Sequence, residues 1–157
     1  MHPDTSGHCL LNRGKHVKTH NKMVTSTTKI RVRYAETDQM GYVYYGNYAM
    51  YYEVARVEAL RQMGFAYKKL EKMGIMMPVI DLKNRFIKPG MYDELLTIKV
   101  TIPEMPAVKM RFTYEITNES DELINTGETT LFFASTETGK PVRIPEIMKS
   151  LFEPFYK

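Results

Sequence analysis

The sequence predicts a single α+β domain in which a curved antiparallel sheet wraps around one long helix. Three observations support this prediction. A helical apolar stripe runs through residues 47–63, one alternating strand-like segment precedes it, and several alternating segments joined by short turns follow it. The 157 residues, 43% hydrophobic and 25% charged, are enough to build one globular core.

The first predicted strand covers residues 28–34. Apolar and basic side chains alternate along it: Ile30, Val32 and Tyr34 against Lys29, Arg31 and Arg33. This is the pattern of a half-buried strand. A loop at residues 35–41 and a short extended piece at 42–45 then lead into the helix.

The long helix is predicted from Asn47 to Met63. At 100° per residue, one uncharged stripe forms along it: Tyr48, Tyr51, Tyr52, Ala55, Ala59 and Met63. A smaller apolar row on the opposite side predicts an enclosed helix. Asn47 suits an N-cap and Gly64 a helix end, and a short second helix is expected at residues 67–73.

From residue 75 onward the pattern predicts strands. The segment 75–87 is extended, with an edge or irregular start at Pro78. Alternating runs follow at residues 96–102 and 108–116, and a last long strand covers 123–135. The short turns between these runs predict an antiparallel meander.

Residues 1–24 differ from the rest. They contain no aromatic residue and hold the four His residues and the single Cys of the chain. Four basic residues stand against one acidic residue, so we expect a disordered or non-native basic tail before a folded domain at 25–157. No secretory signal or membrane-length apolar stretch is present, which predicts a cytoplasmic protein without a membrane span.

The folded domain contains neither His nor Cys. This excludes a Ser-His-Asp triad, a Cys-His nucleophile and a His-ligated zinc site within it. An acid or base there must be a carboxylate, a Lys or a Tyr. No metal or cofactor is expected, and the absence of a basic excess argues against a nucleic-acid partner.

The loop before the helix carries two carboxylates, Glu36 and Asp38. The backbone N–H groups at the helix start, from Tyr45 to Ala49, lack intrahelical partners and could polarise a carbonyl. Asp38 lies seven residues ahead of Tyr45 and can fold back to face it. This pairing suits hydrolysis of an activated acyl group. The alternative is that Asp38 only forms an Asx turn and the tyrosines only fill the core.

The run from Tyr34 to Tyr48, continued by Tyr52-Glu53 and Ala55-Arg56, resembles the signature of hotdog-fold acyl-CoA thioesterases. The closest branch is the 4-hydroxybenzoyl-CoA thioesterase-like family. The likeness continues through residues 86–95 and 140–145 and so covers about 28–148. The family fold, a long helix wrapped by an antiparallel sheet, agrees with the independent pattern above.

The resemblance implies that Asp38 acts as nucleophile or general base and that the backbone N–H of Tyr45 binds the thioester carbonyl. Many relatives carry His at the position of Tyr45, so a role for that imidazole must be absent or taken by a phenol. Substrate-binding positions are expected in the same motif and on a later strand: Gly41, Val43, Asn47, Tyr48, Lys109 and Arg111. Further candidates for the phosphate or pantetheine end are Arg85, Lys88 and Arg143.

The family also implies a homodimer or homotetramer whose neighbouring subunit completes each pocket. The resemblance implies an acyl-CoA substrate. An acyl-carrier-protein substrate stays open, because the basic cluster that binds nucleotide phosphates in the 4-hydroxybenzoyl-CoA enzyme is missing here. A non-catalytic hotdog protein that binds acyl thioesters is the alternative. A hydroxyacyl dehydratase is disfavoured, because those enzymes use a His.

Overall fold

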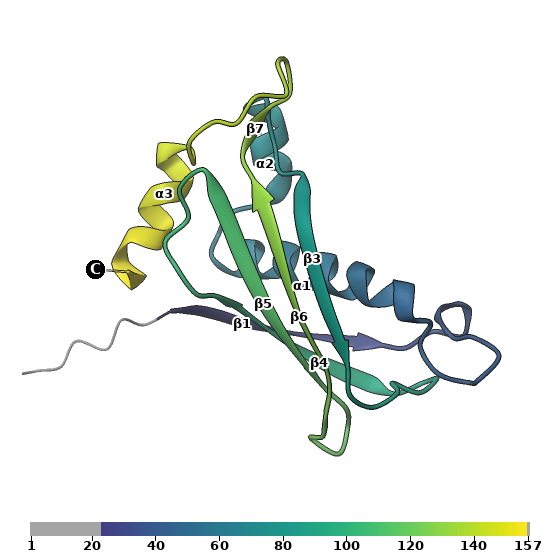
Figure 1. The fold of residues 1–157 in the computed structure, drawn as a ribbon. Helices are drawn as coiled ribbons and strands as arrows, with labels where there is room; N and C mark the ends of the chain where they lie inside the picture. The colour runs from purple at the N-terminus through teal and green to yellow at the C-terminus, as the bar shows by residue number, and fades with distance from the viewer. Residues whose placement is uncertain (1–22, 157) are drawn as a thin grey trace, which may run out of the picture.

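A five-stranded antiparallel sheet curves past one long helix in the computed structural model, which describes residues 23–156 (Figure 1). The strand order is β1-β4-β5-β6-β3. The bounds are β1 Val24–Arg31, β3 Val79–Phe86, β4 Leu95–Ile102, β5 Lys109–Thr117 and β6 Leu123–Phe132. A small ladder pairs β2, Ile75–Met76, with β7, Ala134–Ser135. The predicted α+β hotdog architecture is confirmed.

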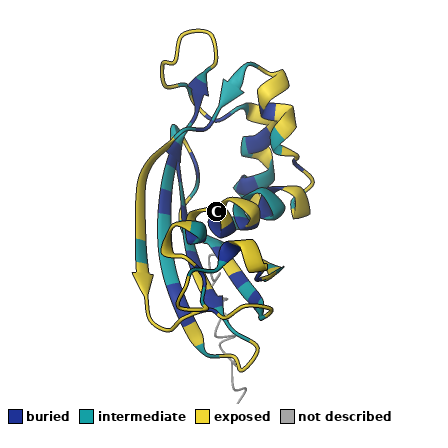
Figure 2. Ribbon diagram, turned by 90° about the vertical axis from the view of Figure 1, so that its right-hand side faces the viewer, coloured by how far each residue is buried: buried dark blue, intermediate teal, exposed yellow. Residues whose placement is uncertain are grey.

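The long helix α1 spans Tyr48–Gln62, within one residue of its predicted ends. Five members of the predicted stripe are buried at 0–3% exposure: Tyr48, Tyr51, Tyr52, Ala55 and Ala59. Buried positions occur on both the long helix and the strands of the sheet (Figure 2). The short helix α2 follows at Tyr67–Lys72, as expected.

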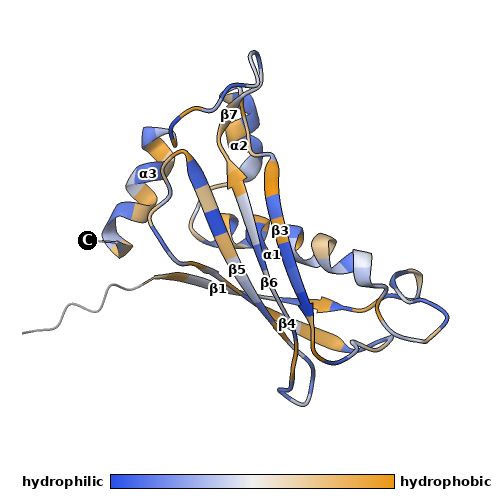
Figure 3. Cartoon of the chain, viewed as in Figure 1, coloured by the Kyte–Doolittle hydropathy of each residue, from blue (hydrophilic) through white to orange (hydrophobic). Residues whose placement is uncertain are grey.

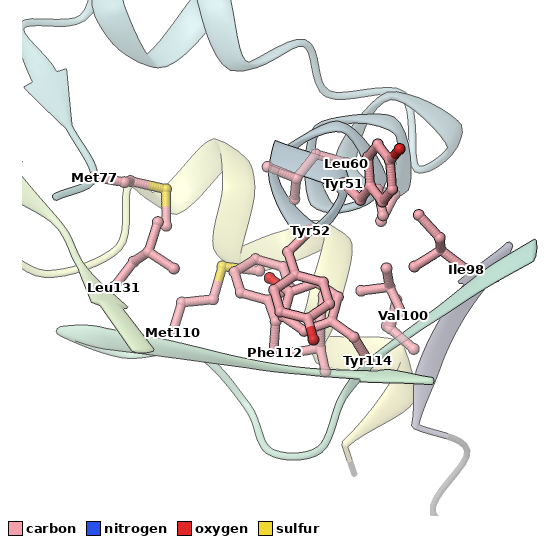
Figure 4. Close-up of a cluster of buried hydrophobic side chains, with 14 of the residues drawn as sticks. Tyr51, Tyr52, Leu60, Met77, Ile98, Val100, Met110, Phe112, Tyr114 and Leu131 are labelled. Atoms are coloured by element: carbon pink, nitrogen blue, oxygen red, sulfur yellow. The ribbon is translucent and has the colours of Figure 1, made fainter. Parts of the chain in front are cut away.

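The sheet turns its apolar side toward α1. Along β4 and β5 buried residues alternate with more exposed polar ones, which confirms the predicted strand pattern and is visible as alternating hydropathy in Figure 3. In the core, the rings of Tyr52 and Tyr114 stack with centroids 4.2 Å apart (Figure 4). This stacking ties the N-terminal half of α1 to β5.

The first strand differs from its prediction. It begins at Val24 and ends at Arg31, whereas Tyr34 lies in a 3-10 turn, Tyr34–Glu36, and is 80% exposed. The Thr- and Ser-rich start has little apolar character but pairs residue by residue with β4, from Val24 opposite Ile102 onward. Backbone pairing, which needs no apolar side chain, therefore extends the strand. The predicted tail otherwise lies outside the described residues.

The meander prediction holds only for β4, β5 and β6. β3 precedes β4 in sequence but pairs with β6 at the far edge of the sheet, and β1 takes the place beside β4. The extended segment 75–87 is interrupted before Val79, because Pro78 has no N–H for a ladder. The edge position suggested by Pro78 is confirmed.

Helix α3, Glu146–Phe152, followed by a 3-10 turn at Glu153–Phe155, was not expected from the sequence. Met148 and Phe152, four residues apart, are fully buried, and this spacing after Pro145 was the available signal. Tyr156 then fastens the C-terminal segment, because its hydroxyl donates to the carbonyl of Ile102. Among the helices of residues 23–156, none has both the length and the apolar character needed to cross a bilayer.

Candidate active site

The loop that carries Asp38 folds back on itself as a tight hairpin. Thr37 and Val43 form an antiparallel bridge, and the N–H of Asp38 donates to the carbonyl of Tyr42 at 3.0 Å. Gly41 closes the turn with φ +83°, a left-handed conformation that glycine adopts without strain. The hairpin turns residue 38 back toward the start of α1, as the sequence predicts.

The hairpin is also attached to the segment that follows β3. The N–H of Val43 donates to the carbonyl of Gly90 at 2.8 Å, and Tyr42 bridges to Met91. A Cβ on Gly90 would lie 3.3 Å from side-chain carbons of Val43 and Ile124, which is a tight contact. The end of β3 and the Asp38 loop are therefore held side by side.

The start of α1 leaves backbone donors free, as expected. A 3-10 turn at Tyr45–Asn47 leads into the helix. The N–H groups of Tyr45 and Gly46 have no acceptor among residues 23–156. The expected side-chain cap by Asn47 is wrong: its amide donates instead to the carbonyl of Glu36 at 2.8 Å.

A cavity of about 300 Å³ lies between this loop, the helix start and the end of β3. It brings together five of the predicted site residues, Asp38, Val43, Tyr45, Tyr48 and Lys88. The end of β3 and the chain after it form the other wall. The remaining lining residues are Met40, Tyr42, Phe86, Ile87 and Pro89.

The other predicted positions lie outside this cavity. Gly41 and Asn47 shape the loop and the helix start through their backbone and amide contacts. Lys109 and Arg111 lie on β5, and neither lines the cavity. Their contact with substrate remains a prediction.

Only one oxygen of the Asp38 carboxylate is hydrogen-bonded within residues 23–156. Its Oδ1 accepts the N–H of Met40 at 2.9 Å, which is an Asx turn. Its Oδ2 has no donor within residues 23–156. The structural and the catalytic interpretations of Asp38 are therefore compatible, since one oxygen fixes the side chain and the other is available to the cavity.

Aromatic rings form much of the cavity wall. Tyr45 and Tyr48 both meet Phe86 edge to face, with ring centroids 6.4 Å and 5.6 Å apart. Burial raises the pKa of the Tyr48 phenol, so it stays protonated near neutral pH. These walls are suited to an apolar or aromatic acyl group.

The basic residues predicted to bind substrate differ in whether they already form ion pairs. Lys88 lines the cavity and pairs with Glu122 at a half-exposed position. Arg111 donates two hydrogen bonds to Glu104 at 2.8 Å and one to Glu128 at 3.2 Å. These carboxylates already neutralise Arg111, whereas Lys109 has no ion-pair partner in the described part of the chain.

No cluster of three His, Cys, Asp or Glu side chains that could hold a metal ion occurs within residues 23–156. The polar groups gathered at the cavity are one carboxylate, free backbone N–H groups, phenols and the ammonium group of Lys88. They match chemistry in which an oxygen nucleophile attacks a carbonyl carbon.

Comparison with known proteins identifies the family. Residues 32–152 match the model of the thioesterase-like superfamily. The chain belongs to that superfamily. The match includes the Asp38 loop, all of α1 and the whole of β3, and it agrees with the hotdog fold.

Individual relatives carry related names. The putative acyl-CoA thioesterase YneP of Bacillus subtilis is 36% identical over 121 residues, 77% of this chain and 88% of that protein. The acyl-CoA thioester hydrolase YbgC of Escherichia coli O6:H1 is 29% identical over 79% of this chain and 92% of its own length. A solved DHNA-CoA thioesterase from Staphylococcus aureus superposes with a TM-score of 0.79 at 39% identity, covering 85% of this chain and 89% of that one.

Proposed function

We propose that this superfamily member is an acyl-CoA thioesterase that hydrolyses the thioester to a free acid and CoA. The observation that carries the proposal is the single cavity that holds both a free carboxylate oxygen and a helix start with unpaired N–H groups. The relatives' names support the same reaction and the same class of substrate.

In this proposal the thioester carbonyl oxygen accepts the N–H of Tyr45, at the positive end of α1. That hydrogen bond strengthens as negative charge develops on the oxygen, so it stabilises the transition state more than the bound substrate. Asp38 Oδ2 then has two possible roles. As nucleophile it forms an acyl anhydride and expels the thiolate, and water hydrolyses the anhydride; as general base it takes a proton from the attacking water.

The exposed edge of β3 supports a homodimer that completes the cavity. Val79, Ile80, Leu82 and Phe86 are each 43–54% exposed, although all are apolar. β1, the other edge of the sheet, exposes Thr, Lys and Arg instead. Exposed apolar side chains on an unpaired edge strand are covered most simply by the same edge of a second copy, paired antiparallel.

Such a pairing would place the partner beside the acyl cavity. Phe86 ends β3, and Phe86 and Ile87 both line the cavity, so a second copy along this edge would form its missing wall. A tetramer of two such dimers is the larger assembly that we expect from the family, and a cytoplasmic location remains a prediction.

An acyl-carrier protein is the second candidate source of the thioester. The cavity lining offers one cation, Lys88, and the carboxylates of Glu104 and Glu128 already occupy Arg111. The phosphates of a CoA nucleotide have few basic partners on one subunit. A carrier protein would not need them, because its own surface can contact the enzyme.

The decisive experiment measures thiol release from a panel of acyl-CoA and acyl-carrier-protein substrates, with wild type and Asp38→Asn in parallel. Asparagine keeps the acceptor for the Met40 N–H but is a much weaker base and nucleophile. We expect kcat to fall by roughly 10²–10⁴, the range for loss of a catalytic base. Ligand binding without thiol release by wild type would instead support the non-catalytic alternative.

A further inference from the structure

Glu36 is a buried acidic residue in the loop before α1, two positions ahead of Asp38. Only 4% of its surface is exposed, and it does not line the cavity that Asp38 lines. An ionised carboxylate in such a position is unfavourable unless its oxygens are hydrogen-bonded. Because Glu36 does not line the cavity, substrate contact does not explain a buried carboxylate at this position.

The carboxylate of Glu36 joins the chain after β1 to the first turn of α1. Its Oε2 accepts the backbone N–H of Arg33 at 2.9 Å and the hydroxyl of Tyr51 at 2.8 Å. Its Oε1 accepts Nε of Arg33 at 2.9 Å and a second bond from the same guanidinium. Four donors from two elements therefore converge on one side chain.

The backbone carbonyl of Glu36 holds the far end of the same loop. It accepts the N–H of Tyr44 at 2.9 Å and the side-chain amide of Asn47 at 2.8 Å. Glu36 therefore holds both ends of segment 37–43, which contains Asp38: one end through the peptide bond and the other through its backbone carbonyl. The turn that presents the Tyr45 N–H starts directly after Tyr44.

Glu36 is held in its ionised form, in which both carboxylate oxygens accept hydrogen bonds. Burial alone raises the pKa of this carboxyl, but the hydrogen bonds from Arg33 and Tyr51 together outweigh burial and hold the pKa below its usual value. Burial and the neighbouring carboxylate raise the pKa of Tyr51, which keeps its hydroxyl as a donor. Glu36 is therefore ionised at neutral pH, and charge-assisted bonds are the stronger kind.

We propose that Glu36 is a positioning residue that holds the Asp38 loop against the start of α1 without touching the substrate. The inference rests on the proposed function, since the position of Asp38 affects turnover only if Asp38 attacks or activates water. The effect can be large, because a misplacement of about 1 Å at a reacting group can cost on the order of 100-fold in rate.

Glu36→Gln tests this positioning role, because glutamine has the size of glutamate but no charge. We expect kcat to fall about 10- to 100-fold, while KM for the same acyl-CoA stays within about threefold because the cavity walls are unchanged. Tyr51→Phe removes one of the four bonds and should give a smaller loss in kcat. Near-UV circular dichroism and thermal unfolding show that each variant is folded at the assay temperature.

A double-mutant cycle with Asp38→Asn separates positioning from general support of the fold. If Glu36 acts through Asp38, Glu36→Gln costs less than about threefold once Asp38 is already replaced. Wild-type kcat in Glu36→Gln, or an equal loss in both backgrounds, would overturn the inference. Turnover that is unaffected by Asp38→Asn alone would reject the role proposed for Asp38, and this inference with it. No thiol release by wild type from any acyl-CoA would reject the proposed function itself, which is a different result.

Discussion

The ring of Tyr52 on α1 lies directly against the backbone of Gly127 on β6. A Cβ at residue 127 would overlap the phenol oxygen and two ring carbons of Tyr52. Tyr52 is fully buried, and its hydroxyl bonds to Asn84 and Asn125. The glycine therefore sets how closely the helix approaches the sheet, which in turn places the helix start beside the end of β3.

Gly127→Ala should destabilise the fold, because the rigid, stacked ring of Tyr52 cannot move aside freely. We expect a loss of about 3 kcal/mol in the free energy of unfolding, at the upper end of overpacking costs, measured by urea denaturation. Thr126→Ala, at a half-buried position on the outer face of the same strand, is the matched control and should change stability by less than about 1 kcal/mol. Equal stabilities for the two variants would contradict this account of the helix–sheet contact.

Glu36 should make stability depend on pH at the acid end. Its pKa is lowered in the folded state, so its contribution is complete above the ordinary pKa of an unfolded Glu and is lost as the pH falls through the folded value. Glu36→Gln should therefore cost about 1–3 kcal/mol at pH 7 and clearly less at pH 3. Urea unfolding at both pH values measures this difference.

The control for that comparison is Glu137→Gln, an exposed position without an ion-pair partner among residues 23–156. It should leave unfolding free energies unchanged at both pH values. The difference in unfolding free energy between wild type and Glu36→Gln should shrink toward pH 3. A difference that stays constant or widens would show that the charge of Glu36 is not what stabilises the loop.

A charge on the apolar edge of β3 should prevent pairing of two copies. Leu82→Glu places a charge on the edge that each copy buries in the proposed dimer and should yield monomers with reduced kcat/KM, since each cavity loses a wall. Light scattering after size-exclusion chromatography measures the mass. Thr27→Glu on the opposite edge strand should leave the assembly intact, and a wild type that is itself monomeric would refute the proposed dimer.

Lys88 should bind the phosphate-bearing part of CoA, because it is the cation that lines the cavity. Lys88→Ala is expected to raise KM for an acyl-CoA about 5- to 10-fold and to leave KM for an acyl-N-acetylcysteamine, which has no phosphate, nearly unchanged. Lys83→Ala on β3, outside the cavity, is the control. Parallel KM values for Lys109→Ala and Arg111→Ala test the binding roles predicted for these two residues.

The sequence alone gave a correct account of α1 and of the central strands. The stripe from Tyr48 to Ala59 and the alternation along β4 and β5 each report which side of an element is buried. Burial of one face is a local property, because it repeats with the period of the element itself. The motif around Asp38 and Tyr45 likewise located the loop that lines the cavity.

Other features were outside the reach of such patterns. Periodicity did not indicate that β3 pairs with β6 instead of β4, because both arrangements bury the same faces. The first four residues of β1 were missed, since backbone pairing leaves no apolar signal. The sequence does not reveal the role of Glu36, because a loop carboxylate is usually solvated and its four donors come from Arg33 and Tyr51.

The sequence by itself determined the helix, its buried face, the central strands and the chemistry open to a domain without His or Cys. The tertiary structure decided that β3 ends beside the Asp38 loop, that one oxygen of Asp38 is left free, and that Glu36 is enclosed. The physical reason is that hydrogen bonds and cavity walls join residues far apart in the chain. Local propensity and spacing carry no information about which distant segments meet.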